Sequence, residues 1–175
     1  FGGLYRSTDE GATWTSQATS PNLLGWRTDG NDAGGQAWYD LALAVNPTDK
    51  DEIFVGGVNI WTSKNGGTTW NLASHWYGGG GAPYVHADVH DLEYRPGTDE
   101  LYAGTDGGVY RSENNGGTWT ELVQDYITTQ FYAIAFNPQG QVLGGTQDNS
   151  SLWLNLEGSN PKFATALLGG DGVGC

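Results

Sequence analysis

Two histidines and a carboxylate alternate in the segment His86-Ala87-Asp88-Val89-His90. Side chains two residues apart share a face of a β-strand, so all three would point the same way in an extended segment. The outer pair would be ~13 Å apart at a strand's rise per residue, too far to share one ion easily. Two interpretations remain open. One is a divalent metal held by His86, Asp88 and His90 with help from a further carboxylate, and the other is a hydrogen-bonded polar ladder without metal. No other cofactor is expected.

Two aspartates in glycine-rich turns are candidates for acid–base chemistry. Asp106 lies in a Thr-Asp-Gly-Gly turn, and Asp148 lies in a Thr-Gln-Asp-Asn turn. Glycoside hydrolysis uses two carboxyl groups, ~5–5.5 Å apart for retention or ~6.5–9.5 Å apart for inversion. Asp88 and Asp171 are further candidates for one carboxyl group of such a pair. Because aspartate before glycine is also an ordinary turn residue, a structural role is the alternative.

Aromatic side chains occur beside carboxylates and amides in the same loop segments. A sugar stacks its apolar ring face on an aromatic side chain, while its hydroxyls bond to carboxylates and amides. The aromatic residues could instead pack between elements of the fold, because they bury large areas. The candidate substrate-binding residues are Trp26, Trp38, Tyr39, Trp76, Tyr77, Gln147 and Asp171.

A repeat organises the chain that must position these residues. Three segments share the pattern Ser-x-[Asp/Asn]-x-Gly-x-Thr-Trp, and their spacing of about 50 residues is that of propeller blades. The Asp or Asn side chain accepts backbone hydrogen bonds in a tight turn, Gly supplies a positive φ, and Trp packs the outgoing strand. The residues of the pattern are Ser7, Asp9, Gly11, Trp14, Ser63, Asn65, Gly67, Trp70, Ser112, Asn114, Gly116 and Trp119.

The segments before the repeats predict strands and no helix. Apolar residues alternate with a period of two along residues 39–47, 90–96 and 132–138, and each segment ends in a turn at proline. No part of the chain shows a convincing helical period. The sequence therefore predicts an all-β protein.

Composition excludes several classes of partner. The 175 residues carry a formal charge of −13, which argues against nucleic acid and against an anionic membrane surface. No apolar run approaches the ~20 residues of a membrane-spanning helix, so no membrane insertion is expected. Aromatic residues make up 13% of the chain, so it is not an acidic disordered tail.

The three segments resemble Asp-box (BNR) repeats, found in sialidases, sortilin-type receptors and xyloglucan-degrading β-propellers. The resemblance implies a β-propeller of four-stranded antiparallel blades, with each Asp-box between the third and fourth strands and away from the binding face. Sialidases bind a carboxylate through clustered arginines. Only Arg27 of the four arginines lies in a predicted binding-face loop, so a sialidase site is not expected in this chain.

Counting blades predicts an incomplete arc of about three and a half blades. Propellers close with 4–8 blades, so the remaining blades are expected from the same or another chain. The predicted parts are residues 1–20 (second half of a blade), 21–76 (a blade with a long binding-face loop), 77–125 (a blade), 126–168 (a blade without Asp-box) and 169–175 (a connection to a further blade).

Residues 35–175 are also similar to large secreted propeller proteins of Bacteroidota-type bacteria. The similarity rests on motifs such as Tyr84-Val-His-Ala-Asp-Val-His90 and Gly169-Gly-Asp-Gly172, and it departs at Ser150, where such proteins have Gly. It implies a secreted or cell-surface location, with a signal peptide and a type IX sorting domain outside this chain. The leading hypothesis is an extracellular binding or scaffold propeller that engages glycans or a protein partner. The alternative is a polysaccharide-active glycoside hydrolase with paired aspartates.

Overall fold

The computed structural model describes residues 1–123, 129–155 and 164–172. Among these residues the regular elements are all strands. None of the described ranges contains a helix long and apolar enough to cross a membrane. The predicted boundary at residues 125 and 126 lies outside the described residues. The chain divides into two compact units, Phe1–Gln124 and Asp125–Cys175, and each is described by itself.

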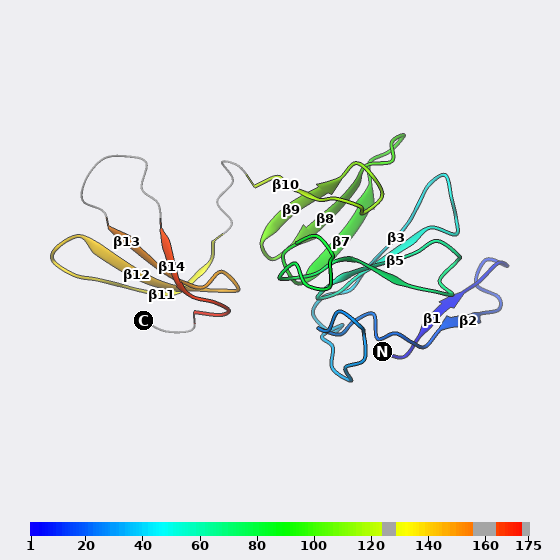
Figure 1. Ribbon diagram of the computed structural model, residues 1–175, viewed down its shortest axis with the longest axis horizontal. Coiled ribbons are helices and arrows are strands. Elements are labelled where there is room, and N and C mark those ends of the chain that lie inside the picture. The colour runs from blue at the N-terminus through cyan, green and yellow to red at the C-terminus, as the bar shows by residue number, and fades with distance from the viewer. Residues whose placement is uncertain (124–128, 156–163, 173–175) are drawn as a thin grey trace. The chain divides into compact units, whose positions relative to one another are not determined.

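The strands form antiparallel sheets in which consecutive strands are neighbours (Figure 1). The first unit contains a two-stranded sheet and two four-stranded sheets, and the second unit contains one four-stranded sheet. The strands are β1 (Leu4–Arg6) and β2 (Thr15–Ala18); β3 (Ala42–Val45), β4 (Ile53–Gly56), β5 (Ile60–Ser63) and β6 (Asn71–Ser74); β7 (Val89–Tyr94), β8 (Leu101–Thr105), β9 (Gly108–Ser112) and β10 (Thr120–Glu121); β11 (Phe131–Phe136), β12 (Gln141–Thr146), β13 (Ser151–Asn155) and β14 (Thr165–Leu168). The predicted fold class is confirmed: the chain is all-β and built of four-stranded propeller blades.

The main core lies between the second and third sheets. Strand β3 alternates as the sequence predicts, with Ala42 and Ala44 buried and Leu43 and Val45 exposed. The small buried residues let β3 and β4 pack closely on β7. Phe54 of β4 and Tyr94 of β7 meet edge to face with ring centroids 6.4 Å apart. Full burial of a side chain such as Phe54 contributes about 1.5–3 kcal/mol to folding.

The repeated turns after β5 and β9 join the third and fourth strands of their sheets, at the end opposite the turn between the second and third strands, and the first repeated turn joins β1 and β2. In the turn after β5, the Ser63 hydroxyl donates to Asn65 Oδ1 (3.0 Å) and accepts the Gly67 N–H (2.9 Å). Asn65 Oδ1 also accepts the Thr69 N–H at 2.9 Å. Gly67 has φ = 92°, in the left-handed region that favours glycine. The turns that begin at Ser7 and Ser112 make equivalent hydrogen bonds.

The tryptophans of the turns are used in two ways. Trp14 and Trp70 each donate the indole N–H to a carbonyl of their own turn. Trp119 instead donates to the carbonyl of Ala73 in the neighbouring sheet at 3.3 Å and packs on the main core. Trp14 and Trp70 therefore close their own turns, whereas Trp119 links its sheet to the neighbouring sheet.

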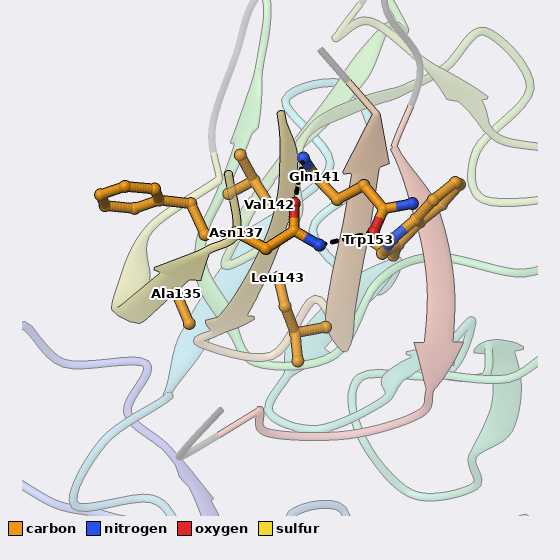
Figure 2. A pocket seen from close by; sticks show the side chains of 7 residues that line it. Ala135, Asn137, Gln141, Val142, Leu143 and Trp153 are labelled. Atoms are coloured by element: carbon orange, nitrogen blue, oxygen red, sulfur yellow. Dashed lines mark hydrogen bonds between the residues drawn. The ribbon is translucent and has the colours of Figure 1, made fainter. Parts of the chain in front are cut away.

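The second unit is the sheet β11–β14, and its apolar side chains are largely exposed. Ile134 and Phe136 are 63% and 82% exposed. An open hollow of about 310 Å³ lies on this sheet. Figure 2 shows the side chains that line it, among them Trp153. Beside it, Asn137 donates its amide to Gln141 Oε1 at 2.7 Å, which closes the turn between β11 and β12 (Figure 2).

Candidate functional site

The candidate residues of the first unit converge because of sheet topology. In an antiparallel meander, the start of the first strand, the turn between the second and third strands and the end of the fourth strand lie at one end. Tyr39 precedes β3, His90 lies near the start of β7, and Asp106 lies between β8 and β9. These side chains therefore lie at the end opposite the repeated turns.

Asp106 is held by two hydrogen bonds from neighbouring aromatic side chains. The Tyr39 hydroxyl donates to Asp106 Oδ2 at 2.7 Å, and His90 Nε2 lies 2.7 Å from Asp106 Oδ1. The rings of Tyr39 and His90 meet edge to face with centroids 5.0 Å apart. The carboxylate is thus fixed in one orientation beside an aromatic surface.

A second carboxyl group, Asp40, lies close to this site and was not singled out from the sequence. Asp40 is 1% exposed and follows a turn in which its backbone N–H donates to the Gln36 carbonyl. The Gln36 side-chain amide donates both to Asp40 Oδ2 (3.3 Å) and to Asp88 Oδ1. Asp40 Oδ1 is buried without a hydrogen-bond partner. The carboxyl groups of Asp40 and Asp88 thus both contact the side-chain amide of Gln36.

Burial and mutual repulsion change the titration of both carboxyl groups. Burial, followed by the negative charge of Asp88, raises the pKa of Asp40 to about 7. Burial, followed by the charge of Asp106, raises the pKa of Asp88. Nothing in the sequence indicates that Asp40 is buried, because an aspartate between a turn and a strand is usually exposed to solvent.

The shared strand face assumed for His86, Asp88 and His90 is wrong. Strand β7 begins only at Val89, and Asp88 has φ = 65°, which breaks the alternation of faces. His86 packs its ring on Gly107, and its Nδ1 lies 3.2 Å from the carbonyl oxygen of Ala87. His90 pairs with Asp106 instead. Metal binding by this set stays a prediction.

A separate group of aromatic side chains surrounds His75, directly after β6. His75 is fully buried, and its Nδ1 accepts the N–H groups of Tyr77 (3.4 Å) and Gly79 (3.2 Å). Its proton therefore lies on Nε2, which donates to the Trp26 carbonyl at 3.2 Å. Burial lowers the pKa of His75. Trp76 and Tyr77 pack edge to face 4.8 Å apart, so His75, which was not predicted, connects three of the predicted residues.

Trp38 is the most exposed of the predicted aromatic residues. Its side chain is 86% exposed, and its ring lies 5.8 Å from that of Tyr39. Trp26, Trp76 and Tyr77 are 42%, 40% and 63% exposed. All the predicted aromatic residues therefore keep ring surface that a ligand could contact, rather than packing fully into the core.

The other predicted residues belong to the second unit. The Asp148 N–H donates to Asp171 Oδ1 at 3.0 Å, and Asp148 has φ = 54°. The Gln147 N–H donates to the carbonyl of Gln130 at 2.9 Å. The structure thus brings Asp148, which lies between β12 and β13, close to Asp171, which follows β14. Asp106 belongs to the first unit.

The comparisons with known proteins point to one group of enzymes. No protein-family model matches the chain. The chain is 28% identical over 142 residues to a xyloglucanase from Paenibacillus sp and 29% identical over 145 residues to a xyloglucanase from Hypocrea jecorina (strain QM6a). Each match covers 69% of the chain, which spans only 13% and 16% of those relatives.

Solved structures support the fold. An ancestral GH74 enzyme matches with a TM-score of 0.50 at 18% identity, over 87% of this chain and 20% of that enzyme. The GH74 enzyme of Niastella koreensis also matches with a TM-score of 0.50, at 17% identity, over 93% of this chain and 26% of that enzyme. The chain shares the β-propeller fold with these proteins.

Proposed function

We propose that this chain is part of an extracellular β-propeller that binds a polysaccharide at the face formed by Trp38, Tyr39 and Asp106. The observation that carries the proposal is the contact between an exposed aromatic pair and an oriented carboxylate. Trp38 offers an open ring for stacking, and Tyr39 holds Asp106 where it can accept sugar hydroxyls. The similarity to xyloglucanases makes xyloglucan the first glycan to test.

Hydrolysis of that polysaccharide is the second candidate function. Asp88 and Asp106 have different surroundings: burial favours the protonated form of Asp88, whereas Asp106 accepts two hydrogen bonds. Carboxyl groups whose surroundings differ in this way can serve as acid and base. We propose Asp88 as the acid and Asp106 as the ionised carboxylate. The predicted pairing of Asp106 with Asp148 stays an alternative.

The repeated turns support membership of the Asp-box propellers. Serine and Asn or Asp form the same hydrogen bonds in all three turns, and the turns after β5 and β9 lie between third and fourth strands and away from the proposed binding face. We propose that they are Asp-boxes with a structural role only. We also propose that the protein is secreted to the cell surface or medium. A protein partner at the same face is the alternative ligand.

Completion of the first blade is also part of the proposal. The sheet β1–β2 has two strands where the other sheets have four. Beside it lies a cavity of about 320 Å³, lined by residues that include Leu4, Leu23 and Leu41. Two further strands, from the same protein or another chain, would pair with β1 and fill this apolar space.

The full-length protein that contains this chain tests both functions. We expect xyloglucan or a related glucan to bind in titration calorimetry, and Asp106→Asn to weaken the binding because a charged acceptor of sugar hydroxyls is lost. If the protein is a hydrolase, reducing ends appear and Asp106→Asn reduces their release by at least ~100-fold. Binding without turnover across plant, algal and bacterial polysaccharides would overturn the hydrolase. Absence of binding to every glycan in that panel would overturn the proposed function.

A further inference from the structure

Asp40, Asp88 and Gln36 form a group of oxygen-bearing side chains behind the proposed binding face. Asp40 stands directly before β3, and Asp88 stands directly before β7. The two carboxyl groups lie within hydrogen-bonding reach of each other, and each also contacts the Gln36 amide. The group therefore joins the second and third sheets at their first strands.

Asp40 is the member of the group whose hydrogen-bond acceptor sites are not all filled. The residue is 99% buried, yet its Oδ1 receives no hydrogen bond. An ionised carboxylate has about four acceptor sites, and leaving them unfilled in the interior costs free energy. The Gln36 NH₂ donates to both carboxyl groups, and a positive centre between them, either a proton or a cation, would further reduce their repulsion.

The surroundings favour a cation that prefers oxygen ligands. Asp40, Asp88 and Gln36 all offer oxygen ligands, while His90 pairs with Asp106 and His86 packs on Gly107. Rotation of the Gln36 amide by half a turn would replace its NH₂ by its carbonyl oxygen at the point that both carboxylates contact. Two carboxylates and one amide oxygen are typical Ca²⁺ ligands, and Ca²⁺ tolerates irregular geometry better than Mg²⁺.

We propose that Asp40, Asp88 and Gln36 bind a calcium ion that joins the second and third sheets. Water would supply the remaining ligands, since Ca²⁺ takes six to eight oxygens. The ion would offset the burial and the like-charge repulsion that raise the pKa values of Asp40 and Asp88. It would also fix the turn that carries Trp38 and Tyr39. Calcium bound to Asp88 is not compatible with the role of Asp88 as the acid in the hydrolase candidate, whereas the proposed glycan binding by Trp38, Tyr39 and Asp106 does not depend on the ion.

Calcium titration of the full-length protein tests the proposal without any glycan, so its outcome is separate from that of the glycan assays. The protein is stripped with EDTA, dialysed and titrated with CaCl₂ alone by calorimetry, and its thermal unfolding is followed in parallel. We expect a dissociation constant of ~10⁻⁴–10⁻³ M, as in extracellular calcium modules, and a higher Tm in CaCl₂ than in equimolar MgCl₂.

Three variants decide whether the ion binds at this group. Asp40→Asn keeps the shape and removes one charge, and we expect it to weaken calcium binding at least ~10-fold. Gln36→Glu adds a charged ligand, so we expect ~10-fold tighter binding. Glu93→Gln, an exposed carboxylate on β7, is the matched control and should bind as the parent protein does.

The proposal is overturned if the parent protein shows neither heat nor a Tm shift at about 10 mM CaCl₂. It is also overturned if Gln36→Glu binds calcium with unchanged affinity, a result that decides the matter even if Asp40→Asn does not fold. A Tm gain for Asp40→Asn in EDTA with no calcium response in the parent protein would assign a shared proton to the pair instead.

Discussion

Tyr39 donates a hydrogen bond of 2.7 Å to Asp106 across 67 residues of sequence. The donor precedes the first strand of one sheet, and the acceptor lies in a turn of the next sheet. The contact therefore joins two blades and also sets an exposed ring beside a carboxylate that is 14% exposed. Stability and ligand binding are linked through this one hydrogen bond.

Tyr39→Phe separates the hydrogen bond from the ring. The variant keeps the aromatic surface and loses the donor to Asp106, so we expect a loss of about 1 kcal/mol in the free energy of unfolding. Glycan affinity should fall less in Tyr39→Phe than in Tyr39→Ala, which also loses the stacking surface. Urea unfolding and calorimetry measure the two effects. Equal affinities for the two variants would show that the ring does not contact the ligand.

Trp38→Ala tests the most exposed ring. Because Trp38 is 86% exposed, its removal should change the Tm little, while glycan affinity should fall by ~2–10-fold through lost stacking. Trp14→Ala is the matched control, because Trp14 is 63% exposed but belongs to a repeated turn at the other end of its sheet. A similar loss of affinity in both variants would contradict the assignment of the binding face.

His75→Gln tests the pH dependence of the aromatic group. Burial lowers the pKa of His75 in the folded protein below its ordinary value of 6.5. The unfolded state therefore binds more protons, and the stabilising effect of neutral His75 is lost as the pH falls below about 6.5. The Tm of the parent protein should drop more between pH 7.5 and pH 5 than that of His75→Gln. Parallel pH profiles would refute this role for His75.

The repeated turns should differ in their contribution to stability. Ser63 is fully buried in its turn, whereas Ser7 is partly exposed. Ser63→Ala leaves the buried Gly67 N–H without its acceptor and removes the hydroxyl donor to Asn65 Oδ1, so we expect a loss of about 1–3 kcal/mol. Ser7→Ala should cost less, because water can replace the lost hydrogen bonds. Chemical unfolding of both variants gives the comparison, and a larger loss for Ser7→Ala would contradict it.

The blades and their turns were predictable because their hydrogen bonds are local. Ser63, Asn65 and Gly67 interact across two to four residues, so residue type and spacing alone specify the turn. The alternation in β3 likewise follows from a period of two. The strand expected to include His86 and Asp88 starts later, because nothing local indicates the left-handed backbone at Asp88.

The sequence by itself determined the all-β class, the repeat and the residue types at the proposed binding face. The tertiary structure decided which of these residues meet: Tyr39 with Asp106, and Asp40 with Asp88 through Gln36. It also buried Asp40 and His75, which carry no local signal of burial. The contacts of Tyr39 with Asp106, of Gln36 with Asp88 and of His75 with Trp26 join segments 49 or more residues apart, and only tertiary packing brings such segments together.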